Sequence, residues 1–124
     1  MSTNLKIISD LRNFIALSAQ DGALKKLFTG SPKDFSRKRK LHFERIVCML
    51  LNFFKKSYSI EISEFFTWLG CEDLKASKSA FSQQRLKINS YFFSCLNVVL
   101  ADSFYTHYKD EIKRWNGFRV IAVD

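Results

Sequence analysis

The sequence predicts an all-α fold, a helical bundle followed by a single β-strand. Apolar residues recur at helical spacing along much of the 124 residues, 47% of all residues are hydrophobic, and Gly and Pro number only 4 and 1. A chain of this length can build a hydrophobic core, and so few turn-forming residues favour helices joined by short connections. We expect a helical domain over residues 1–114 and the first strand of a second domain over residues 115–124.

The first helix is expected over residues 4–19, with Asn4 or Thr3 as its cap. Its apolar residues are spaced to share one stripe. They are Leu5, Ile8, Leu11 and Ile15. Asp21-Gly22 ends this helix, and a brief helical turn can follow over residues 23–28.

The strongest helix is predicted after a second break at residues 29–32, where Ser31 can act as a cap and Pro32 can take the first helical position. The basic run Ser36-Arg37-Lys38-Arg39-Lys40 is expected to open this helix and Lys55-Lys56 to close it. Four consecutive cations have three interpretations: a solvated flank, a clamp on DNA phosphates, or a localisation signal. The residues that follow favour the clamp.

The net charge of +8 is divided into blocks along the chain. Residues 36–56 hold seven basic and one acidic residue (+6), residues 57–74 hold four acidic and no basic residues (−4), and residues 75–90 hold four basic and no acidic residues (+4). A phosphate backbone favours cations gathered on one face. Membrane binding is disfavoured, because the most apolar run, residues 91–101, is too short to span a bilayer. We therefore expect a nucleic-acid partner and no membrane.

A short helix is expected over residues 60–69, with Glu61 in its first turn and Gly70 just past its end. With the helices before and after it, this segment predicts a helix-turn-helix-like unit. The connection over residues 71–76 is longer than the usual three or four residues, which departs from the simplest form of that motif.

Residues 77–88 carry the main functional prediction. Ser77 can cap a helix whose core side holds Ala80, Phe81 and Ile88, with Gln84 between them. The opposite face is small, polar and basic, as a helix in a DNA major groove requires. It comprises Lys78, Ser79, Ser82 and Gln83, flanked by Arg85 and Lys87. A merely solvated face is the alternative interpretation.

A long apolar helix, predicted from Tyr91 to about Lys109, is expected to be the spine against which the other helices pack. Trp115-Asn116-Gly117 predicts a turn, and residues 118–124 predict a strand that has no partner within the chain. Three cysteines far apart in sequence indicate neither a disulfide framework nor a zinc site. The N-terminus lacks the apolar core of a signal peptide, so a cytoplasmic setting is expected.

Three blocks of this sequence, in this order, resemble the N-terminal part of insertion-sequence DDE transposases, nearest to the IS-four family. They are Phe35-Ser36-Arg37-Lys38-Arg39-Lys40-Leu41, Ser77-Lys78-Ser79-Ala80-Phe81-Ser82-Gln83-Gln84-Arg85 and Trp115-Asn116-Gly117-Phe118-Arg119-Val120-Ile121-Ala122-Val123-Asp124. The resemblance covers nearly the whole chain. Two positions depart from the family's pattern: Gln84 stands where a small residue is expected, and Leu86 where a basic one is expected.

The resemblance implies a helical DNA-binding region followed by a ribonuclease-H-like catalytic core. By position, Asp124 matches the first acidic residue of the catalytic triad and would be a metal ligand. Such triads hold two Mg²⁺ or Mn²⁺ ions for phosphodiester hydrolysis and strand transfer. The other two acidic residues would lie beyond residue 124. The chain alone is therefore expected to use no cofactor and to lack phosphodiester hydrolysis and strand transfer. Whether it counts as part of an enzyme is uncertain from the sequence.

The implied function is recognition of double-stranded DNA at the terminal inverted repeats of a transposon, in cut-and-paste transposition at the bacterial nucleoid. Arg37, Lys38, Arg39 and Lys40 would hold the phosphate backbone. The helix of residues 77–88 would contact bases and phosphates through Lys78, Ser79, Ser82, Gln83, Arg85 and Lys87. Two alternatives stay open: a standalone helix-turn-helix regulator or transposition inhibitor, and a structural helical adaptor. Self-association is also left open.

Overall fold

The computed structural model describes residues 2–36, 40–53 and 56–123. In these ranges the chain is mostly helical, as predicted, and one short two-stranded sheet follows the helices. A 3₁₀ turn at Glu72–Leu74 lies between the fourth and fifth helices. The helices are α1 (Thr3–Gln20), α2 (Gly22–Phe28), α3 (Phe43–Asn52), α4 (Tyr58–Trp68), α5 (Lys78–Arg85) and α6 (Tyr91–His107).

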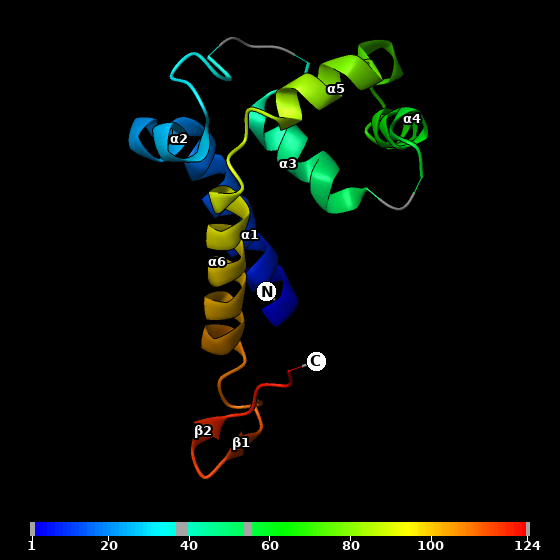
Figure 1. Ribbon diagram of the computed structural model, residues 1–124. Coiled ribbons are helices and arrows are strands. Elements are labelled where there is room, and N and C mark those ends of the chain that lie inside the picture. Colours follow the sequence, from blue (N-terminus) through cyan, green and yellow to red (C-terminus); the bar gives the residue numbers. More distant parts are fainter. Residues whose placement is uncertain (1, 37–39, 54–55, 124) are drawn as a thin grey trace.

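The helices form two groups (Figure 1). The first is the pair α1 and α6, which lie side by side and run in opposite directions, with α2 at one end of the pair. The second group consists of α3, α4 and α5 and projects to one side of that end. The molecule is therefore elongated, and its C-terminal hairpin lies at the far end of the α1–α6 pair from α5.

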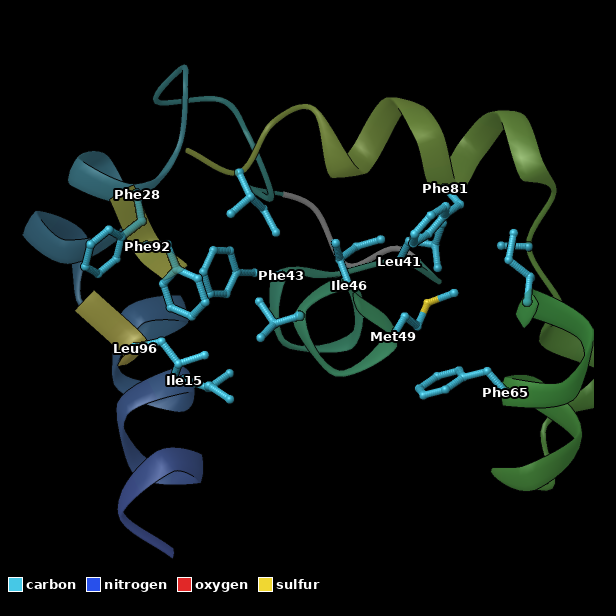
Figure 2. Packing of buried hydrophobic residues seen from close by; sticks show 14 of the residues in the cluster. Ile15, Phe28, Leu41, Phe43, Ile46, Met49, Phe65, Phe81, Phe92 and Leu96 are labelled. Carbon is cyan, nitrogen blue, oxygen red and sulfur yellow. The ribbon is translucent and has the colours of Figure 1, made fainter. Parts of the chain in front are cut away.

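One hydrophobic core connects the two groups (Figure 2). On the α1–α6 side, the ring of Phe92 meets the rings of Phe28 and Phe43 edge-to-face, with centroids 5.3 and 5.1 Å apart. On the other side, Phe81 carries the core to α5. Between them Ile46 and Met49 of α3 are fully buried. The central helix is thus α3, whereas α6, the predicted spine, packs mainly on α1.

The prediction for the start of the helix at α3 is wrong. It begins at Phe43, with His42 as its N-cap, so Ser36 and Lys40 lie outside it. Nor does Pro32 open a helix, because the backbone N–H of Asp34 donates to the carbonyl of Ser31 at 3.0 Å in a turn. At Phe35 the backbone takes a φ of 56°, which a right-handed helix cannot accommodate.

The C-terminal segment corrects the prediction of a lone strand. The strand β1 (Arg114–Trp115) pairs antiparallel with β2 (Phe118–Arg119). Asn116 and Gly117 have φ values of 48° and 81°, and a two-residue type I′ hairpin turn requires positive φ at both positions. The predicted turn is therefore confirmed, and it closes a hairpin whose partner strand is the segment just before it. Asp124 lies outside the described residues.

Candidate nucleic-acid interface

Local hydrogen bonds determine where the helix α5 begins and ends. The Oγ of Ser77 accepts a hydrogen bond from the backbone N–H of Ala80 at 3.1 Å, which confirms Ser77 as the N-cap. At the other end, the N–H of Lys87 donates to the carbonyl of Gln84 at 3.1 Å, which tightens the last turn. Ile88 has left the helix and forms an isolated β-bridge with Thr29. The predicted helix is thus real but ends at Arg85.

Two side chains hold α5 on its neighbours. Phe81 is fully buried, and its ring centroid lies 5.0 Å from that of Phe53 and 5.3 Å from that of Tyr58. The Nη1 of Arg85 donates to the Tyr58 hydroxyl at 2.6 Å, and the guanidinium carbon lies 5.5 Å from the centre of the Tyr58 ring. This hydrogen bond and cation–π contact attach the end of α5 to α4. Together they fix the direction in which the rest of α5 faces.

The face of α5 that points away from the core is polar, as predicted. Lys78, Ser79 and Gln83 are exposed, and Ser82 is half-buried between them. The Nε2 of Gln83 lies 3.4 Å from the Oγ of Ser79, within hydrogen-bonding distance one turn back along the helix. Leu86, with 78% of its surface exposed, follows on the same side. We call Lys78, Ser79, Ser82 and Gln83 the polar face of α5.

Arg85 and Lys87 lie differently from their predicted positions beside the polar face. Arg85 is half-buried and bound to Tyr58, so its charge is directed toward α4 and it positions the helix. Lys87 is half-buried, and its carbonyl accepts a hydrogen bond from Gly30 at 3.1 Å. The role of Tyr58 had no sequence signal, because it precedes Arg85 by 27 residues and carries no motif.

Residues 28–30, which precede the segment with the basic run, lie beside the end of α5. The Asn89 N–H donates to the Phe28 carbonyl at 2.8 Å, next to the Gly30–Lys87 bond. Residues 29–36 and 40–41 are consequently at the same end of the molecule as α5 (Figure 1). Lys40 is exposed, and its carbonyl accepts from Nη1 of Arg45 at 2.8 Å. Arg37, Lys38 and Arg39 lie outside the described residues, and their contacts with phosphates stay predictions.

Two acidic side chains of the middle block lie on α4 and have a structural partner in the connection that precedes this helix. Glu64 pairs with the Nζ of Lys56 at 2.9 Å, and this hydrogen bond raises the pKa of Lys56. Glu61 is buried, and its Oε1 accepts from the backbone N–H of Lys56 at 3.2 Å. Both carboxylates therefore secure the connection between α3 and α4.

A serine, an aspartate and a histidine meet between α1 and α6, a cluster that sequence reasoning missed. The Oγ of Ser103 and the Nε2 of His107 lie 2.6 and 2.9 Å from the same oxygen of Asp10. The hydrogen bond from Ser103, followed by that from His107, lowers the pKa of Asp10. A nucleophilic relay needs the histidine between the other two groups, so this cluster serves to join the helices. Asp10 is 93 residues from Ser103 and 97 from His107, so no local pattern connects it with them.

In the described part of the chain, no group of three or more His, Cys, Asp or Glu side chains could hold a metal ion. No helix of that same part is long and apolar enough to cross a membrane. Comparisons of the chain with protein-family models, with curated proteins and with solved structures find no match. The resemblance to transposases therefore rests on the three sequence blocks.

Proposed function

We propose that this chain is the DNA-binding region of an insertion-sequence DDE transposase of the IS-four type, and that α5 reads transposon-end DNA. One observation carries the proposal. The polar face of α5 is free of carboxylates and is held in one direction by buried Phe81 and by the Tyr58–Arg85 contact. A helix presented in this way has the side chains and the rigidity that major-groove recognition requires.

The polar face has suitable chemistry for both parts of DNA recognition. The amide of Gln83 can pair with the edge of adenine through two hydrogen bonds, a contact that contributes about 1–3 kcal/mol of discrimination. Lys78 lies in the first turn of α5 and can contact a phosphate or a guanine. Ser79 and Ser82 are small, so the helix backbone can approach the groove closely. Specificity would thus come from Gln83 and affinity from the lysine.

The basic segment supports α5 in this proposal. Hydrogen bonds between residues 28–30 and 87–89 hold the chain that precedes the basic run next to the end of α5. In the proposal, the cations that follow contact the phosphates that flank the groove. Each neutralised phosphate contributes about −0.9 to the slope of log K against log salt concentration. Lys40 is the described member of this run, and the proposal assigns the same role to Arg37, Lys38 and Arg39.

The arrangement also accounts for the unusual connection before α5. In the proposal, α4 and α5 are the two helices of a helix-turn-helix-like unit and α3 is the helix that supports them. Residues 69–77 connect them and include the 3₁₀ turn Glu72–Leu74. The connection is longer than in the simplest motif, in which a short turn fixes one helix against the other. Here the packing of Phe81 on Phe53 and Tyr58 holds α5 in place.

The catalytic part of the proposal concerns Asp124 alone. By the family resemblance it would be the first acidic residue of a triad that binds Mg²⁺ or Mn²⁺. Asp124 lies outside the described residues, and the other two acidic residues of the triad would lie beyond it. Residues 1–124 would then bind transposon ends without cutting them.

Fluorescence anisotropy with labelled DNA duplexes tests the proposal. A duplex selected from a random pool should bind in about 50 mM salt and lose affinity steeply toward about 200 mM. Lys78→Ala should reduce the salt slope by about 0.9, whereas Lys6→Ala, an equal charge change on α1, should leave it unchanged. Absence of duplex binding at the lower salt concentration would refute the proposal.

A further inference from the structure

The helix α6 is apolar on nearly all sides, yet only one side of it is covered. From Tyr91 to His107 the only Asp, Glu, Lys or Arg is Asp102. Phe92, Leu96 and Ser103 are buried on the covered side. A helix that is hydrophobic all round is normally surrounded by protein. The other side of α6 is therefore expected to have a partner.

The uncovered side of α6 borders an apolar groove of about 520 Å³ between α1, α3 and α6. Two leucines of its lining are partly exposed: Leu100 on α6 is 41% exposed, and Leu51, in the last turn of α3, is 56% exposed. Its lining residues come from α1, from the last turn of α3 and from α6. Its walls are formed by Leu11, Leu51, Phe93, Leu96, Asn97 and Leu100.

The total exposed surface also exceeds that of a compact monomer. A folded monomer of 14.5 kDa exposes about 6,900 Å². This chain exposes 9134 Å², which is about 2,200 Å² more. Part of the excess belongs to the C-terminal hairpin, whose strand residues are all exposed, and part reflects the elongated shape of the molecule. A stable dimer of standard size buries about 800 Å² on each partner, so the excess is sufficient for one.

We infer that this groove and the adjoining side of α6 are the contact surface for a second copy of the chain. Electrostatics selects this face. Each copy carries a net charge of +8, so most approaches between two copies bring cations together. Between Tyr91 and His107 there is no Lys or Arg, so two copies can meet along α6 without that repulsion.

The geometry of the face suits a two-fold contact. In such an interface the same patch is used by both partners, so each copy offers a groove and also the residues that fill one. Leu100 lies at the groove edge and can enter the groove of the partner copy. Ser94 and Asn97 also line the groove and are small enough for a partner helix to approach. The polar face of α5 is not part of this surface, so DNA binding and self-association involve different residues.

Sedimentation velocity of the whole chain, from about 1 to about 100 μM without DNA, tests the inference. The mass should rise from 14.5 kDa toward twice that value with concentration. Leu100→Glu should weaken self-association at least about tenfold, because an unpaired carboxylate would be buried at the contact. Leu17→Glu is the matched control: Leu17 is 53% exposed on α1 and does not line the groove, so the dimer should persist.

Leu51→Glu, on the opposite wall of the groove, should have the same effect as Leu100→Glu. It provides a second test if circular dichroism shows that Leu100→Glu has lost helix. A wild-type chain that stays monomeric throughout would overturn the inference. Equal dissociation by Leu17→Glu, or an unchanged dimer in both groove variants, would overturn it as well. These outcomes are independent of duplex binding, which tests the proposed function separately.

Discussion

The helices α5 and α6 differ in what they expose. The short helix α5 buries one large side chain, Phe81, and presents polar residues to solvent. The longer helix α6 buries Phe92 and Leu96 and leaves Leu100 half-exposed. A polar face is well hydrated in water and remains available to a charged ligand. An apolar face is stabilised when protein covers it and removes it from water. This difference is why we propose DNA binding at α5 and self-association at α6.

The largest expected effect comes from removing the anchor of α5. Phe81→Ala should lower the free energy of unfolding by about 3–5 kcal/mol, because it removes a fully buried aromatic ring and leaves a cavity. Urea denaturation followed by circular dichroism measures this change. Leu86→Ala, only five residues away but mostly exposed, should change the unfolding free energy by less than about 0.5 kcal/mol. Similar losses in both variants would mean that α5 is not held by Phe81.

Gln83→Ala should reduce the discrimination between DNA sequences without changing the stability of the fold. Its side chain is exposed, so the unfolding free energy should change by less than about 0.5 kcal/mol. Discrimination between the selected duplex and one with a single substituted base pair should fall by about 1–3 kcal/mol at one position. Competition anisotropy with a panel of substituted duplexes measures it. Undiminished discrimination at every position would assign base recognition to other residues.

Tyr58→Phe tests whether Arg85 positions α5 or contacts DNA. The variant keeps the ring and loses the hydroxyl that accepts from Arg85, so stability should drop by about 0.5–1.5 kcal/mol. DNA affinity should fall moderately while the salt slope stays the same, because no phosphate contact is lost. Tyr105→Phe, a matched loss of a hydroxyl on α6, should leave DNA affinity unchanged. A reduced salt slope in Tyr58→Phe would contradict the positioning role.

The smallest expected effect is a pH dependence at the α1–α6 contact. Hydrogen bonds from Ser103 and His107 lower the pKa of Asp10 in the folded state. A lowered folded-state pKa contributes stability above the unfolded pKa, and this stability is lost as the pH falls through the folded value. The urea midpoint should therefore decrease on acidification below about pH 4. Asp10→Asn should show a weaker decrease, and an identical pH profile would show that Asp10 contributes nothing.

Helical periodicity was sufficient where a helix has one clear apolar side. The spans of α1 and α4 follow within about two residues from the spacing of apolar residues, and the start of α5 follows from its cap at Ser77. The cap of α1 is Ser2 and not Asn4 or Thr3, and α5 ends at Arg85, before Ile88. Periodicity was insufficient at the start of α3. At Phe35 the backbone has a positive φ, and the Phe35 carbonyl accepts a hydrogen bond from the Nζ of Lys25, ten residues earlier. Leu41 is buried in the core. The apolar spacing of the helix does not encode either feature.

The hairpin and the candidate site also combine features that the local sequence predicts with contacts that it does not. Asn116-Gly117 was recognisable as a turn, but its strand partner is only Arg114–Trp115, too short to have an alternating pattern. The polar face of α5 was recognisable from spacing, yet the attachment of Arg85 to Tyr58 was not. Two residues far apart in the chain come together only when the core packs, so no local pattern encodes their contact.

The sequence by itself determined that the chain is mostly helical and that α5 carries a polar and basic side opposite Phe81, because both depend on residues three or four positions apart. Only the tertiary structure decided which cations of that helix remain free, since Tyr58 binds Arg85 while Lys78 stays exposed. It also decided that α6 is covered on one side only. That outcome depends on how whole helices pack, and the spacing of residues within one helix does not specify it.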